Sequence, residues 1–143
     1  MTATSVNSHQ DLTGAGGEPA SLLDAGDQVR REVLGDAHVD RSRDNATDFS
    51  RPLQDLVTEY CWGAIWTRPG LPLATRSLLN IAMLTALGKP DELRLHVRGA
   101  IQNGCTVQEI QEVLLQTAVY CGVPAALEAS RNAQAVLEEL GRA

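Results

Sequence analysis

The segment PDELRLHVRGAIQNGCTVQE, residues 90–109, decides the fold class because it holds one complete helix and the start of the next. Pro90 suits the first turn of a helix, and Gly104 suits the position just after its last turn. Apolar residues follow helical spacing between these two points, at Leu93, Val97, Ala100 and Ile101. Thr106 and Glu109 then have the spacing of a capping box. The segment predicts two consecutive helices.

The same kind of pattern extends over the rest of the chain and predicts an all-α, single-domain bundle of about six helices. The segment 36–50 is polar and predicts a loop, whereas residues 1–20 are rich in Gly, Ser and Thr and predict a disordered arm before a helical domain at 21–143. The other helices are expected over residues 21–34, 49–62, 73–87, 107–121 and 125–140.

The composition limits the classes of partner. The formal net charge is -6, which disfavours nucleic acid and anionic membranes because both require clustered basic residues. No apolar run reaches membrane-spanning length, so we expect a cytoplasmic protein. The three cysteines lack metal-ligand or C-x-x-C spacing and are expected to be buried or half-buried free thiols: Cys61, Cys105 and Cys121.

His96 lies at the edge of the apolar stripe of its helix, and Glu92 lies one turn earlier on the same edge. A contact between the carboxylate and the imidazole would raise the pKa of His96 and make it a proton donor near neutral pH. A half-buried histidine that bonds to the backbone fits the pattern as well. The residues alone leave both interpretations open.

Arg76 and Asn80 project from one side of a helix that is otherwise apolar. A buried arginine must meet an anion or a carbonyl, so Arg76 either grips a substrate carboxylate or makes a structural salt bridge. Arg68 is a second candidate of the same kind, in the turn after Trp66. Trp62 and Trp66 are packing residues or the wall of a pocket.

Several motifs in order resemble the carboxymuconolactone decarboxylase family, which is related to alkylhydroperoxidase D-type proteins. The motifs are LGDAHVDRS, DLVTEYCWGAIWTRPGLP, TRSLLNIAML, ELRLHVRGAIQNG and EIQEVLLQTAVYCGVPAA, within residues 22–140. The resemblance implies an all-α fold, a homo-oligomer that is a hexamer, and no metal or organic cofactor.

The resemblance also implies a reaction. The expected activity converts γ-carboxymuconolactone, a small anionic lactone, to β-ketoadipate enol-lactone in protocatechuate catabolism. His96 would protonate the dienolate, with Glu92 tuning it and Arg76 or Arg68 holding the carboxylate that stays. His38 and Arg41 lie in the expected loop, which on the residues alone is a solvated connector that caps helices. The resemblance implies that this loop closes over the substrate or reaches a neighbouring subunit.

The peroxidase branch of this superfamily carries paired cysteines before its histidine. Here those positions are Lys89 and Glu92, and the upstream acidic position is Ser77, which excludes a dithiol peroxidase cycle. The chain also has Ala64 and Leu127 where similar decarboxylases have Glu and Asn. A diverged member acting on another lactone, aromatic or polyketide acid therefore remains an alternative, as does a non-catalytic or redox helical oligomer.

Overall fold

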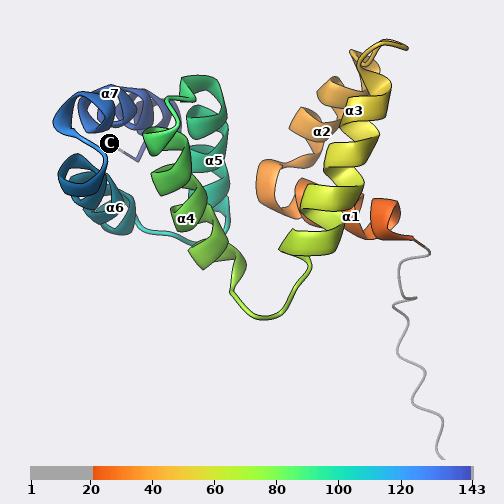
Figure 1. The fold of residues 1–143 in the computed structure, drawn as a ribbon, viewed down its shortest axis with the longest axis horizontal. Helices are drawn as coiled ribbons and strands as arrows, with labels where there is room; N and C mark the ends of the chain where they lie inside the picture. The colour runs from red at the N-terminus through yellow and green to blue at the C-terminus, as the bar shows by residue number, and fades with distance from the viewer. Residues whose placement is uncertain (1–20, 143) are drawn as a thin grey trace, which may run out of the picture.

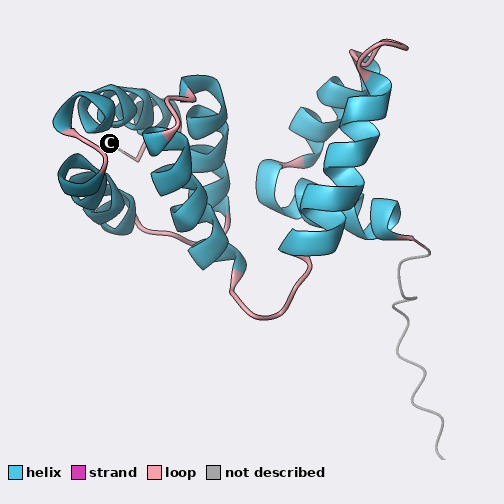
Figure 2. Cartoon of the chain, in the orientation of Figure 1, coloured by secondary structure: helices cyan, strands magenta, loops and turns pink. Residues whose placement is uncertain are grey.

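The computed structural model describes residues 21–142; the arm expected at residues 1–20 lies outside them. Within the described range helices joined by loops are the only regular secondary structure and no strands occur, which confirms the predicted all-α class (Figure 2). The elements are α1 (Leu22–Leu34), α2 (Asp36–Asp44), α3 (Arg51–Val57), the π-helix η1 (Thr58–Trp66), α4 (Leu73–Ala86), α5 (Pro90–Gln102), α6 (Val107–Tyr120) and α7 (Val123–Glu139).

The N-terminal helices α1, α2, α3 and η1 form one group, and α1 packs along η1 (Figure 1). Two glycines make this approach possible. A Cβ added at Gly26 would overlap the Thr58 carbonyl, and one added at Gly63 would overlap the carbonyl of Leu22. The two backbones are therefore in direct contact, and side chains such as Val33 close the core beside them.

The predicted loop over residues 36–50 is wrong in its first part, because α2 occupies Asp36–Asp44. The many charged residues of this segment suggested a loop, but several of them form ion pairs with α1. Arg31 of α1 binds Asp36 and Asp40, and Arg43 binds Asp27 of α1. Val39 is fully buried. The helix is thus held by ion pairs to α1 and by one apolar anchor.

The second predicted helix also differs from the structure. It begins at Arg51, after the exposed Phe49, and α3 continues directly into η1, which ends at Trp66. The hydrogen bonds of a π-helix join residues five apart, and such turns occur frequently at functional sites. Periodicity at 3.6 residues cannot reveal this change.

The C-terminal helices α4 to α7 form the second group and hold the larger core (Figure 1). Its fully buried members include Ile81, Val97 and Val136. The capping box predicted at Thr106 and Glu109 is confirmed: each side chain accepts a hydrogen bond from the other residue's backbone N–H. The capping box and these core positions thus agree with the sequence pattern, whereas α7 begins at Val123, two residues before the predicted start, because Pro124 fits its first turn.

Helix α5 joins the two groups of helices by packing on α1. A Cβ at Gly99 would lie 3.1 Å from the Val33 carbonyl oxygen, and the side chain of Gln102 donates to the carbonyl of Glu32. The segment 67–72 makes the covalent link between η1 and α4. The face of α5 that lies between the two groups carries the candidate site.

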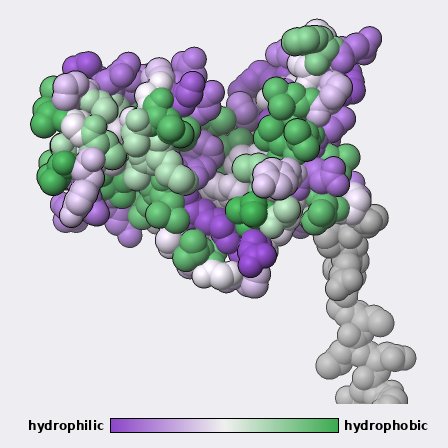
Figure 3. All heavy atoms as spheres, in the orientation of Figure 1, coloured by the Kyte–Doolittle hydropathy of each residue, from purple (hydrophilic) through white to green (hydrophobic). Residues whose placement is uncertain are grey.

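Many large apolar side chains remain exposed on this single chain. In the space-filling view they gather over the C-terminal helices and over part of the N-terminal group (Figure 3). Tyr120 is 81% exposed and Val119 78% exposed, values typical of charged surface residues rather than apolar ones. No helix among the described residues is long and apolar enough to cross a membrane.

Candidate active site

His96 occupies the junction between the two groups of helices. Leu93 and Val97 anchor α5 in the larger core, and the imidazole, one residue before Val97, is half-buried beside that core. It faces η1 on one side and α4 on the other. The position at the edge of the apolar stripe, expected from the sequence, therefore places His96 between elements rather than in solvent.

Two indole rings stack on the imidazole. The ring centroid of Trp62 lies 6.1 Å from that of His96 with 10° between the planes, and that of Trp66 lies 6.0 Å away with 25°. Both tryptophans are 5% exposed and pack on each other at 4.8 Å. They therefore serve as packing residues and as one wall of the site.

Asn80 of α4 supplies the polar neighbour. Its amide nitrogen lies 3.4 Å from Nδ1 and 3.5 Å from Nε2 of His96. An N–H can donate only to a ring nitrogen that carries no proton, and a neutral imidazole has one such nitrogen whereas an imidazolium has none. The amide in this orientation therefore favours the neutral form of His96.

Burial also favours the neutral form of His96. The pKa of His96 is lowered from 6.5 to about 4, chiefly by burial; the charge of Glu92 raises it and that of His38 lowers it further. The prediction that Glu92 would bring this pKa up to neutrality is therefore wrong. Glu92 is exposed, so its field is weaker than the cost of desolvating the imidazolium.

Arg76 meets a carbonyl rather than an anion in this chain. Its Nη2 donates to the carbonyl oxygen of Arg68 at 3.0 Å, which ties α4 to the turn after η1. Its Nε is buried and has no hydrogen-bond partner. Arg68 is exposed and, with Trp66, lines a cavity of about 480 Å³ between α1 and this turn. Trp66 thus touches both the cavity and His96.

His38 and Arg41 lie on α2 and not on a loop. His38 is half-buried, and burial lowers its pKa, as do the positive charges of Arg30 and Arg41. Its charge lowers the pKa of His96 slightly further. Arg41 is exposed at the outer side of this helix.

Arg30 of α1 is a candidate that the sequence analysis missed. It is 8% exposed, and its only hydrogen-bond partners among the described residues are the neutral groups Thr58 Oγ1 at 3.2 Å and Gln54 Oε1 at 3.4 Å. A signal was present, because Arg30 lies four residues after Gly26 and three before Val33 on the buried face of α1.

The cysteines do not form a redox pair. Cys105 is buried and Cys61 half-buried, as predicted, but Cys121 is exposed because the helix ends there, so the prediction for Cys121 is wrong. Residues 21–142 contain no group of three or more His, Cys, Asp or Glu side chains arranged to hold a metal ion.

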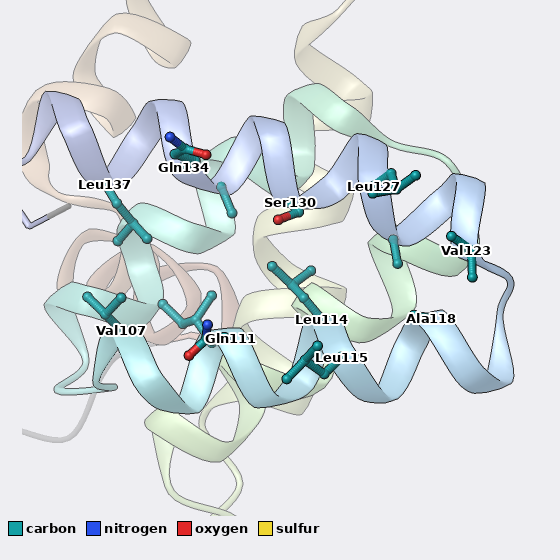
Figure 4. Close-up of a pocket in the computed structure, with 13 residues that line it drawn as sticks. Val107, Gln111, Leu114, Leu115, Ala118, Val123, Leu127, Ser130, Gln134 and Leu137 are labelled. Carbon is teal, nitrogen blue, oxygen red and sulfur yellow. The ribbon is translucent and has the colours of Figure 1, made fainter.

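A separate groove of about 450 Å³ runs between α6 and α7, on helices that carry none of these site residues (Figure 4). Leu114, Leu115 and Leu127 project into it in the close-up. Leu127, one of the two departures noted in the sequence, therefore lines an apolar surface groove rather than the surroundings of His96. Ala64, the other departure, is half-buried on η1.

Comparisons with known proteins agree with this architecture and these motifs. The model of the carboxymuconolactone decarboxylase family matches residues 51–135. A 4-carboxymuconolactone decarboxylase of Acinetobacter baylyi is 47% identical over 114 residues, 80% of this chain and 85% of that protein. A nitrosuccinic acid decarboxylase of Metarhizium robertsii is 45% identical over 119 residues, 83% of each chain.

The family model and these relatives define a carboxy-lyase, an enzyme that breaks a carbon–carbon bond and releases a carboxyl group as CO₂. The chain belongs to the carboxymuconolactone decarboxylase family.

Proposed function

We propose that this decarboxylase converts γ-carboxymuconolactone to β-ketoadipate enol-lactone in protocatechuate catabolism without a cofactor, and that His96 supplies the proton. The observation that carries the proposal is the 47% identity to a 4-carboxymuconolactone decarboxylase over most of both chains. The site supports it with one ionisable ring placed between two indoles.

The substrate supplies its own electron sink. When the C–CO₂ bond breaks, the electron pair passes through the conjugated alkene to the lactone oxygen, CO₂ leaves, and a dienolate remains. The imidazolium of His96 transfers its proton to carbon, and the ring recovers a proton from solvent. Trp62 and Trp66 exclude water from this side of the ring. With less water around it, the reacting carboxylate leaves more readily as neutral CO₂.

Protonation of His96 is then coupled to substrate binding. The free site keeps the imidazole neutral, with a pKa of about 4. An anionic substrate beside the ring brings negative charge into a partly desolvated place and raises that pKa. Asn80 can turn its amide so that its oxygen accepts from the new N–H. Glu92 adds favourable negative charge from the outer edge of α5.

The other predicted residues take supporting roles. Arg76 positions the turn through the Arg68 carbonyl, and this places Trp66 against His96. Arg68 faces the cavity beside the turn and contacts the substrate from its open side. Arg41 supplies positive charge from α2, and His38, whose pKa is lowered, offers a neutral imidazole that can donate a hydrogen bond.

The direct test is incubation with γ-carboxymuconolactone while its absorbance is followed. Turnover that saturates with substrate is the expected result. No turnover at high enzyme concentration would rule out γ-carboxymuconolactone as the substrate. Nitrosuccinic acid should be assayed in parallel, because the fungal relative is named for it and is nearly as similar. Preference for the nitro acid would make this chain a diverged member of the family.

We also propose that the chain forms a homo-oligomer, expected to be a hexamer, and that copies of the chain cover the exposed apolar faces. Two grooves support this: the one between α6 and α7, and one of about 300 Å³ between α4 and α6. The strongly exposed apolar side chains on these helices are Met83, Leu115, Val119, Tyr120, Val123 and Leu127.

A further inference from the structure

Arg30 is a buried cation without an anionic hydrogen-bond partner among the described residues. Its contacts to Thr58 and Gln54 are with neutral oxygens, and its Nε is buried and makes no hydrogen bond. The nearby carboxylate of Asp27 forms ion pairs with Arg31 at 2.9 Å and with Arg43 at 2.8 Å, although its buried Oδ1 makes no hydrogen bond. A desolvated guanidinium in such surroundings costs free energy unless an anion pairs with it.

The π-helix places this cation close to His96. Thr58, Trp62 and Trp66 are the large buried positions of η1, spaced four residues apart on one face. Arg30 bonds to Thr58, whereas His96 stacks on Trp62 and Trp66. The guanidinium and the imidazole therefore contact neighbouring turns on the same face of η1.

His38 interacts electrostatically with both Arg30 and His96. The charge of Arg30 lowers the pKa of His38, and the charge of His38 lowers that of His96. Near neutral pH the positive charge in this region therefore comes from Arg30 of α1 and Arg41 of α2, whereas the two imidazoles are mainly neutral and offer N–H donors. Two carboxylates act in the opposite direction. The charge of the exposed Glu92 raises the pKa of His96, and the charge of Asp27 raises the pKa of Arg30.

We infer that Arg30, with His38, forms a carboxylate subsite that holds the retained carboxyl group of a dicarboxylic substrate while its reacting end lies at His96. The inference rests on the proposed decarboxylase function and deepens it. The Nε and Nη groups of Arg30 offer a planar fork that suits a carboxylate, and the contacts of Arg30 and His96 with neighbouring turns of η1 suit an acid whose two carboxyl groups are a few bonds apart. The site selects dicarboxylates over monocarboxylates of the same length.

Binding of succinate and of butyrate to the full chain tests this, because butyrate replaces one carboxylate of succinate by a methyl group. The two tryptophans of the sequence, Trp62 and Trp66, both contact His96, so intrinsic fluorescence reports on the site. Wild-type protein should bind succinate at least about tenfold more tightly, as expected for charge-assisted hydrogen bonds. Equal binding of the two acids overturns the inference.

The Arg30→Met variant should bind both acids with similar, weak affinity. Arg43→Gln is the matched control, since it also removes one positive charge beside Asp27 but from an exposed side chain. The control should keep the preference for succinate. A preference that survives in Arg30→Met, or that disappears equally in Arg43→Gln, overturns the inference. If thermal unfolding shows that Arg30→Met does not fold, Arg30→Lys and His38→Gln replace it, and a preference unchanged in both also overturns the inference.

Kinetics separate this subsite from the decarboxylase function. If the lactone is decarboxylated, Arg30→Lys should raise KM by about tenfold or more with a smaller change in kcat, because the retained carboxylate is bound in both ground and transition states. Arg30-dependent succinate binding without any turnover supports the subsite and rejects the function. Turnover with KM unchanged in Arg30→Lys supports the function and rejects the subsite.

Discussion

The imidazole of His96 and the indole of Trp62 lie nearly parallel, 10° apart, with their centroids separated by 6.1 Å. This stacking joins α5 of the C-terminal helices to η1 of the N-terminal helices. It also removes water from one face of the ring, and burial is the main reason that the pKa of His96 is lowered to about 4. The same contact therefore supports the fold and sets the protonation state of the proposed proton donor.

Replacement of His96 by Gln should abolish most of the decarboxylase activity and leave the fold intact. The amide keeps a polar group near Asn80 but cannot transfer a proton to carbon, and general acid catalysis typically contributes about 10²- to 10⁴-fold. The measurement is kcat on γ-carboxymuconolactone, with thermal unfolding as the control for folding. Wild-type kcat in a folded His96→Gln protein would refute the assigned role.

Stability should fall as the pH is lowered from 6.5 towards 4, and His96 should account for part of this fall. The folded state holds the pKa near 4 and the unfolded chain near 6.5, so between these values the unfolded state binds more protons. The stabilisation is complete above the unfolded pKa and is lost as the pH falls through the folded pKa. His38, whose pKa is also lowered, acts in the same direction.

Urea unfolding of wild type and of His96→Gln at several pH values between 4 and 7 measures this effect. The dependence of the free energy of unfolding on pH should be weaker in the variant. Parallel curves for the two proteins would mean that His96 titrates alike in the folded and unfolded states.

Binding of a dianion should raise the pKa of His96, since negative charge favours the imidazolium. The sequence has three histidines, so the imidazole resonances can be followed individually by NMR during pH titration. Addition of saturating succinate should move the His96 titration to higher pH, and His96→Gln identifies the resonance. An unchanged titration midpoint would show that succinate binding does not promote protonation of His96.

The sequence predicted the helical class, the capping box at Thr106 and the place of His96 because each depends on local spacing. It did not predict that η1 is a π-helix, and so could not predict that Trp62 and Trp66 both stack on the imidazole of His96. It also treated residues 36–44 as a loop, since the ion pairs that hold α2 are formed with α1. Contacts between distant segments were the missing information.

The two arginine predictions show the same limit. Arg76 was expected to be exceptional because it interrupts an apolar helix, and its bond to the Arg68 carbonyl depends on how the turn folds back. Arg30 was overlooked because it stands next to Arg31 in a charged helix. Only the packing of α1 on η1 distinguishes the two, since it buries Arg30 and leaves Arg31 half-exposed among carboxylates.

The contact between α1 and η1 should tolerate no side chain at Gly26. A Cβ there would overlap the Thr58 carbonyl, and backbone atoms cannot move aside as a flexible side chain can. Gly26→Ala should therefore lower the free energy of unfolding by several kcal/mol, about 2–4, as in overpacked cores. Gly70→Ala is the matched control because nothing lies within 4 Å of the added Cβ, and its unfolding midpoint should stay close to wild type. Similar midpoints for both variants would show that the helices are not so closely packed.

A charge in the groove between α6 and α7 should weaken self-association. Leu127 is 54% exposed in the single chain and lines this groove, so burying a carboxylate there against another copy would leave an unpaired charge. Leu127→Glu should shift the mass measured by light scattering towards smaller species. Arg131→Gln changes the formal charge by the same amount at an exposed position of α7 outside the groove, and should keep the wild-type mass. An unchanged mass in Leu127→Glu would place the interface elsewhere, and a wild-type protein that is monomeric would reject the oligomer itself.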